Sequence, residues 1–190
     1  MNALGRSHFV KASIGWTRGK GFVSSMIRRL EKSYFNHTYY RFDLDNGMSL
    51  IYESHIKGGV QITPYEHLLA AKVKGKVLDV EEVDLNLTPD QCQLLWNNCI
   101  PLHGDSYDAR QILRYYLWIR LLRKKKGSKL FKLNHNDKFT CNEFVVCAGQ
   151  YVIPEITGLD YSYTPERLFT VFHDGEGSRD WAEELSDLPA

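Results

Sequence analysis

The chain has 190 residues, 43% hydrophobic and 25% charged, and this length predicts one compact domain. Its 24 Lys and Arg residues almost balance its 23 Asp and Glu residues, so the net charge argues against nucleic acid or an anionic membrane as a whole-protein partner. No continuous apolar stretch predicts a signal peptide or a membrane span. We therefore expect a protein that is cytoplasmic at synthesis, with its four cysteines as free thiols.

Charge is unevenly distributed near the end of the chain. We expect one domain over residues 1–172 and an acidic tail over residues 173–190. Basic residues dominate between Arg120 and Lys138, around Lys124. Both charged stretches are interpreted as solvated surface. The alternatives are contact between the tail and the basic segment, or a phosphate-rich or protein partner bound through one of them.

The first half of the chain predicts a turn, a helix and a hairpin. Three glycines within residues 15–21 do not fit a phosphate-binding loop and predict a flexible turn. Residues 24–32 then have the apolar spacing of a short helix. The aromatic and branched residues of 38–42 and 48–53 flank Asp45-Asn46-Gly47, a pattern that predicts a β-hairpin.

The middle of the chain carries weaker strand signals and one strong helix signal. We predict a short helix over residues 63–70 and one or two strands over residues 72–83. Thr88 and Gln91 have the spacing of a capping box, which predicts a helix that ends near Cys99.

Three helices are predicted in the last third of the chain. The first, over residues 108–125, carries large apolar residues on several sides and should be buried on more than one of them. The second begins with a capping box of Thr140 and Glu143 and runs to Val152. Residues 164–166 begin a last short helix.

Cys141 directly follows a predicted helix N-cap. Unpaired backbone N–H groups and the positive end of the helix dipole stabilise a thiolate at that position, as a nucleophilic cysteine requires. The alternative, a small apolar core residue, stays open from the spacing alone. Cys147, Cys92 and Cys99 are predicted core residues, and a zinc site from Cys92, Cys99 and His103 is rejected because it lacks a short Cys-x2-Cys knuckle.

A cysteine nucleophile needs a general base, and His37 opens a predicted strand that could hold an imidazole rigidly. If the hairpin loop is residues 45–47, with its glycine left-handed, Tyr39 pairs with Glu53 and His37 with His55. Glu53 and His55 then share the face of His37, and either could orient the imidazole. A two-residue turn would send Glu53 to the opposite face.

The order of these features resembles a known family. A Gly-rich segment with a short helix precedes the strand of His37, the strand of Glu53, the segment Gly104–Asp108 and finally Cys141 at a helix start. This order resembles the permuted branch of the NlpC-type papain-like cysteine hydrolases, which includes the YiiX-like proteins and the lecithin retinol acyltransferase relatives. Asn142 departs from the pattern, because relatives commonly carry Ser after the nucleophile.

The resemblance covers residues 15–152 and implies both a fold and a mechanism. The fold would be α+β of the permuted papain-like type, with a small antiparallel sheet packed on the nucleophile helix. Cys141 would attack an amide or ester carbonyl, His37 would move the proton, and Glu53 would fix the imidazole tautomer. The backbone N–H of Cys141 would stabilise the oxyanion, and no cofactor or metal is expected.

Three functions are compatible with this resemblance. Cleavage of amide bonds in cell-wall peptides is the first expectation. The protein would then reach the cell wall by lysis, through an export partner or as part of a phage particle. Lipid acyl hydrolysis or transfer is the second, and a non-catalytic binding or structural protein is the third. A peptide hydrolase predicts a polar cleft, with Tyr107 and Asp108 as candidate lining residues, whereas a lipid enzyme predicts an apolar groove beside Cys141.

Overall fold

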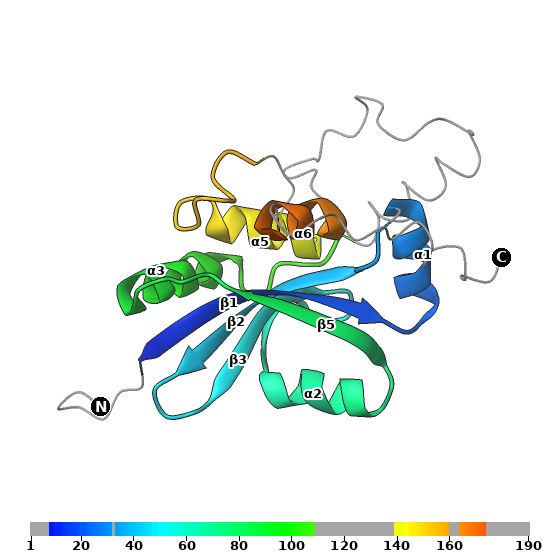
Figure 1. The fold of residues 1–190 in the computed structure, drawn as a ribbon, viewed down its shortest axis with the longest axis horizontal. Helices are drawn as coiled ribbons and strands as arrows, with labels where there is room; N and C mark the ends of the chain where they lie inside the picture. The colour runs from blue at the N-terminus through cyan, green and yellow to red at the C-terminus, as the bar shows by residue number, and fades with distance from the viewer. Residues whose placement is uncertain (1–7, 32, 109–138, 160–163, 174–190) are drawn as a thin grey trace.

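A five-stranded antiparallel sheet forms the centre of the computed structural model, which describes residues 8–31, 33–108, 139–159 and 164–173 (Figure 1). Its strand order is β4-β3-β2-β1-β5, so the fifth strand returns to pair with the first. The strands are β1 (Phe9–Gly19), β2 (His37–Leu44), β3 (Ser49–His55), β4 (Gly59–Pro64) and β5 (Val77–Asp84).

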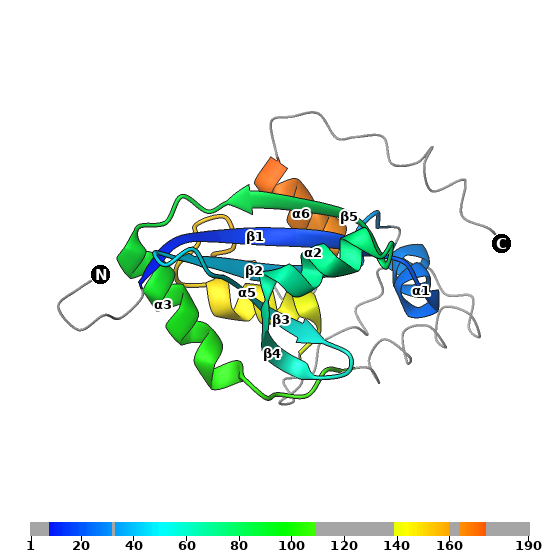
Figure 2. The same cartoon turned by 90° about the horizontal axis from the view of Figure 1, so that it is seen from below.

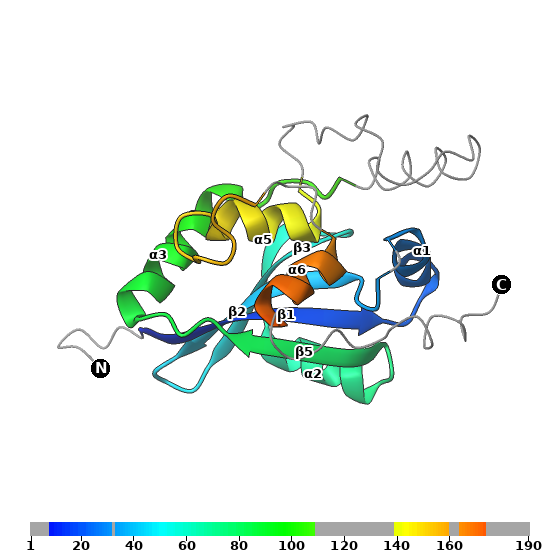
Figure 3. The ribbon, with the colours of Figure 1, turned by 45° about the horizontal axis from the view of Figure 1, so that its top comes forward.

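Helices cover both faces of this sheet. In Figure 1, α3, α5 and α6 lie on one face, and Figure 2 shows α2 crossing the other. Figure 3 shows α6 over β1, in agreement with a 5.2 Å centroid contact between the rings of Trp16 and Phe169. The described helices are α1 (Phe22–Glu31), α2 (Tyr65–Val73), α3 (Pro89–Cys99), the short 3-10 helix η1 (Ile100–Leu102), α5 (Cys141–Gly149) and α6 (Pro165–His173).

Side-chain alternation along β2 separates the two layers. Thr38 and Tyr40 are fully buried on the face that α5 covers, where the Tyr40 hydroxyl donates a 2.7 Å hydrogen bond to the Val145 carbonyl. His37 and Tyr39 point to the opposite face, as the period of two in a strand requires. The start of β2 therefore presents polar groups on the face of α2, at the end of the sheet nearest α1.

The hairpin between β2 and β3 has the predicted three-residue loop. Tyr39 pairs with Glu53, and the N–H of Leu44 donates to the carbonyl of Met48 at 2.9 Å. Gly47 has a φ of +83°, the left-handed conformation that this loop needs. The predicted strand register, which places Glu53 on the same face of the hairpin as His37, is confirmed.

Both predicted capping boxes are present, and they begin α3 and α5 at the expected residues. Helix α5 nevertheless ends at Gly149, three residues before the predicted Val152. The Gly149 carbonyl accepts 2.9 Å hydrogen bonds from the N–H groups of both Val152 and Ile153, so the chain tightens into turns there.

The prediction of a flexible turn at Gly15 and Gly19 was wrong, because both lie in β1. The ring of Tyr39 occupies the space that a side chain at Gly15 would need. Glycine therefore serves close packing at this position.

The helix predicted over residues 63–70 begins and ends later in the chain than expected. Thr63 lies in β4, and α2 starts after Pro64 and runs to Val73. Residues 72–76 thus belong to the helix end and a turn, in which Gly75 has a φ of +65°. The predicted strand is limited to β5.

Several predictions concern residues outside those that the structure describes. They are the helix continuing from Asp108 to Lys125, the basic segment around Lys124, and the tail beyond His173. Among the described helices, none combines the length and apolar character needed to cross a bilayer.

Candidate active site

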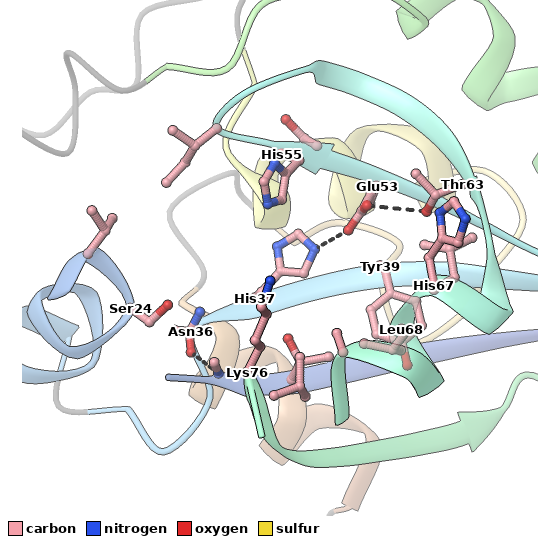
Figure 4. Close-up of a pocket in the computed structure, with 18 of the residues that line it drawn as sticks. Ser24, Asn36, His37, Tyr39, Glu53, His55, Thr63, His67, Leu68 and Lys76 are labelled. Carbon is pink, nitrogen blue, oxygen red and sulfur yellow. Dashed lines mark hydrogen bonds and ion pairs between the residues drawn. The ribbon is translucent and has the colours of Figure 1, made fainter. Parts of the chain in front are cut away.

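His37 and Glu53 form a hydrogen-bonded pair across the hairpin. Nε2 of His37 lies 2.7 Å from Oε2 of Glu53, and the two side chains are 16% and 14% exposed (Figure 4). A carboxylate in this position fixes the orientation and the tautomer of an imidazole. His55, the other candidate from the sequence, instead places its ring edge-on to His37, with 6.3 Å between centroids.

The second oxygen of Glu53 is held by the neighbouring strand β4. Gln61 Nε2 and Thr63 Oγ1 donate to Glu53 Oε1 at 3.4 and 3.3 Å. Gln61 lies directly opposite Glu53 in the ladder between β3 and β4. Neither residue was predicted to belong to the site, because both lie in β4, which was not predicted. The pairing of β4 with β3 is what identifies them.

The pair is charged over a wide pH range. Burial alone would lower the pKa of His37, but hydrogen bonds to Cys141 and Glu53 and their negative charges raise this pKa to about 10. Burial alone would raise the pKa of Glu53, but the hydrogen bond and the positive charge of His37 lower it to about 2. At neutral pH the site therefore holds an imidazolium beside a carboxylate.

Cys141 is the first residue of α5 and is 4% exposed. It lies close enough to His37 to help raise the pKa of the imidazole. Because Glu53 engages Nε2 of the imidazole, Nδ1 is the ring nitrogen left for the sulfur. The structure thus places Cys141 near the hydrogen-bonded pair of His37 and Glu53.

The start of α5 is fixed to the sheet beside Glu53. Ser54, the next residue in β3, donates from its hydroxyl to the carbonyl of Phe139 at 2.7 Å. The N–H of Phe139 donates to the carbonyl of Ser106 at 3.1 Å. Two residues before Cys141, the backbone is therefore held from both sides.

A cavity of about 330 Å³ lies beside the pair, between the sheet, α1 and α2 (Figure 4). His37, Glu53 and His55 line it, but Cys141 does not, so the cavity reaches the imidazole rather than the sulfur. Tyr107 lines it as predicted, whereas Asp108 does not. Polar side chains of several elements complete the wall, among them Thr17, Lys20, Ser24, Asn36, Thr63, His67 and Lys76.

The remaining cysteines differ from Cys141. Cys92 and Cys99 are fully buried in the core, as predicted, but Cys147 is only half-buried. Within the described ranges, no group of three or more His, Cys, Asp or Glu side chains is arranged to hold a metal ion.

Comparison with known proteins gives a likeness to a solved structure. No family model and no curated protein matches this sequence. The sheet and the surrounding helices define an α+β protein with a fold related to that of a solved structural neighbour. That neighbour is the metalloprotein YiiX from Escherichia coli O157:H7, with a TM-score of 0.51 and 19% sequence identity, over 77% of this chain and 67% of YiiX. At this identity the likeness concerns the fold alone.

Proposed function

We propose that the chain is a cysteine hydrolase with Cys141 as nucleophile, His37 as general acid and base, and Glu53 as the residue that orients the imidazole. The observation that carries the proposal is the 2.7 Å hydrogen bond between Glu53 and His37, with Cys141 near this pair at the start of a helix. A cationic imidazole beside a sulfur at a helix N-terminus favours the thiolate.

The proposed reaction has two steps. The Cys141 thiolate attacks the carbonyl carbon, and the resulting oxyanion accepts a hydrogen bond from the backbone N–H of Cys141. The imidazolium of His37 gives its proton to the leaving amine as the carbon–nitrogen bond breaks, which leaves a thioester. Neutral His37 then takes a proton from water as the water attacks the thioester, which releases the acid and restores the Cys141 thiolate beside the imidazolium.

We propose a peptide amide, such as one in cell-wall peptides, as the substrate. The wall of the cavity beside His37 combines apolar side chains, such as Ile27 and Leu68, with hydroxyl, amide, imidazole and ammonium groups, and these polar groups suit hydrogen bonds with a peptide. YiiX is described as a metalloprotein. The described residues of this chain include no set of side chains that fits such an ion, so the proposed steps use none.

A non-catalytic binding protein of the same fold is the second candidate. One observation favours it: Cys141 is 4% exposed and does not line the cavity. A binding role would use the cavity without any attack by the sulfur.

The test is incubation with a panel of muropeptides and acyl lipids, followed by mass spectrometry of the products. We expect the protein to cleave a muropeptide, the Cys141→Ala variant to lose this activity, and the Cys147→Ala control to keep it. Release of fatty acid without muropeptide cleavage would assign the chain to lipid chemistry. Absence of any product, together with a Cys141 that no thiol reagent labels, would favour the binding role.

A further inference from the structure

The charges that line the cavity do not balance. Lys20, Lys76 and His37 contribute positive charges, and Glu53 is the only carboxylate among the described residues that line the cavity. Glu53 is already paired with His37 at 2.7 Å. The charges of the two lysines therefore remain uncompensated in the wall of the cavity.

The fold holds these two lysines side by side. The backbone N–H of Lys20, just after β1, donates a 2.7 Å hydrogen bond to the carbonyl of Lys76, just before β5. Within the part of the chain that the structure describes, neither ammonium forms an ion pair. Like charges on adjacent strands repel each other, and an anion bound between them would relieve this repulsion.

A third positive charge lies behind the same wall. Arg28 is 3% exposed, and its hydrogen-bond partners are the Gly19 carbonyl and the side chains of Asn36 and Ser25, all of them neutral. A guanidinium stays protonated in proteins, so its charge acts on the cavity through Gly19 and Asn36, which line it.

Neutral donors face this end of the cavity as well. Asn36 is 9% exposed, and its Oδ1 accepts from the N–H of Gly19 at 2.7 Å, an arrangement that identifies the other amide atom as Nδ2. Among the described residues Nδ2 has no hydrogen-bond partner. Ser24 places its hydroxyl beside Asn36, as Figure 4 shows.

We propose that Lys20 and Lys76, with Asn36 Nδ2 and the Ser24 hydroxyl, form a subsite for an anionic group of the substrate, a carboxylate or a phosphate. This inference rests on the proposed function and specifies the substrate as one that carries a negative charge near the scissile bond. Ammonium and amide donors around a small cavity are the groups that bind such anions.

Binding can be tested without catalysis, in the Cys141→Ala protein. Inorganic phosphate and succinate, each titrated at constant ionic strength, should raise the thermal unfolding midpoint. The added changes Lys20→Gln and Lys76→Gln should abolish this rise, whereas Lys72→Gln and Lys74→Gln, at lysines that are likewise exposed but do not line the cavity, should preserve it. A response to phosphate alone or to succinate alone identifies the group, and an equal response in both double variants would overturn the subsite.

Substrate preference separates this inference from the proposed function. We expect the wild-type chain to hydrolyse 4-nitrophenyl hemisuccinate with a higher kcat/KM than the neutral 4-nitrophenyl butyrate. The Lys20→Gln, Lys76→Gln variant should reduce the ratio of these two values about tenfold, the loss of one charge-assisted contact. Hydrolysis without a charge preference would refute the subsite alone, and anion binding without hydrolysis would refute the proposed function alone.

Discussion

The hydroxyl of Thr38 donates a 2.7 Å hydrogen bond to Oδ1 of Asn142, and both residues are buried. Thr38 directly follows His37 in β2, and Asn142 directly follows Cys141 in α5. The bond therefore fixes the helix against the strand one residue beyond each proposed catalytic group. Oδ1 also lies 3.9 Å from the sulfur of Cys141, so Asn142 contacts both the strand and the nucleophile.

Loss of the Thr38 hydroxyl should weaken both the fold and the site. Thr38→Val leaves the buried Asn142 oxygen without its main donor, and we expect the free energy of unfolding to fall by about 1–2 kcal/mol. Thr157→Val, at an exposed threonine that also donates to backbone carbonyls, should cost less. Urea denaturation of Thr38→Val, of Asn142→Ala and of the double variant measures the coupling between the two residues, and Thr157→Val serves as the control. Strict additivity of the paired changes would contradict the assigned contact.

The four thiols should react with iodoacetamide at different rates near neutral pH. Burial raises the pKa of Cys92 and of Cys99, so both should react slowly. Cys141 lies beside the cationic His37 and should react fastest, and His37→Gln should slow it. Peptide mapping after a brief exposure provides the measurement. If the half-buried Cys147 reacts as fast as Cys141, the environment of Cys141 is not special.

The His37–Glu53 pair predicts a defined pH dependence of stability. The pKa of His37 is raised from 6.5 to about 10, so its contribution is complete below pH 6.5 and is lost as the pH rises towards 10. The pKa of Glu53 is lowered from 4.5 to about 2, so its contribution is complete above pH 4.5 and is lost as the pH falls towards 2. The stability advantage over His37→Gln should shrink from pH 6.5 to 10, and that over Glu53→Gln from pH 4.5 to 2, in urea denaturation. If the stability advantage of the wild-type protein over His37→Gln grew as the pH rises, the raised pKa of His37 would be contradicted.

Two glycines with the same backbone conformation allow a matched test of the contact between Gly59 and Asp105. Asp105 precedes Ser106, whose carbonyl accepts the hydrogen bond from Phe139. Gly59 and Gly75 have φ values of +66° and +65°. A methyl group at Gly59 would collide with the Asp105 carbonyl, whereas no atom lies within 4 Å of one at Gly75. Gly75→Ala should therefore cost about 1 kcal/mol, the left-handed penalty alone. Gly59→Ala should cost about 1–3 kcal/mol more, because it also overpacks.

Denaturant unfolding of the two alanine variants gives the difference directly. The 2.9 Å bond from the Val60 N–H to the Asp105 carbonyl would break in Gly59→Ala, together with the support for Ser106 and Phe139. Faster trypsin cleavage after Lys57 in Gly59→Ala, relative to Gly75→Ala, would follow from that opening. Equal stability of the two variants would mean that the segment of Asp105 adapts freely.

The sequence predicted those structural features that depend on only a few neighbouring residues. The capping boxes at Thr88 and Thr140 and the loop at Gly47 were predicted because their hydrogen bonds and dihedral angles are set within three or four residues. Strand β1 was missed because it lies between β2 and β5 with helices on both faces. Its buried residues include Ser13 and Gly15, so it shows neither alternation nor an apolar run.

Some residues of the candidate site were likewise predictable from local sequence, and others were not. The register of one hairpin was enough to bring Glu53 to the face of His37. Thr63, Asn36 and His67 reach the cavity through strand pairing and helix packing, which no short sequence pattern encodes. The exclusion of the Cys141 sulfur from the cavity likewise depends on how α5 packs on the sheet.

The position of the sheet in the chain sets the order in which the site residues are synthesised. All five strands lie within residues 9–84, with α1 between β1 and β2 and short turns between β2, β3 and β4. A ribosome therefore synthesises every strand of the sheet, and with them His37 and Glu53, before it reaches residue 141. A fragment that ends after α3 would carry the imidazole and the carboxylate without the proposed nucleophile.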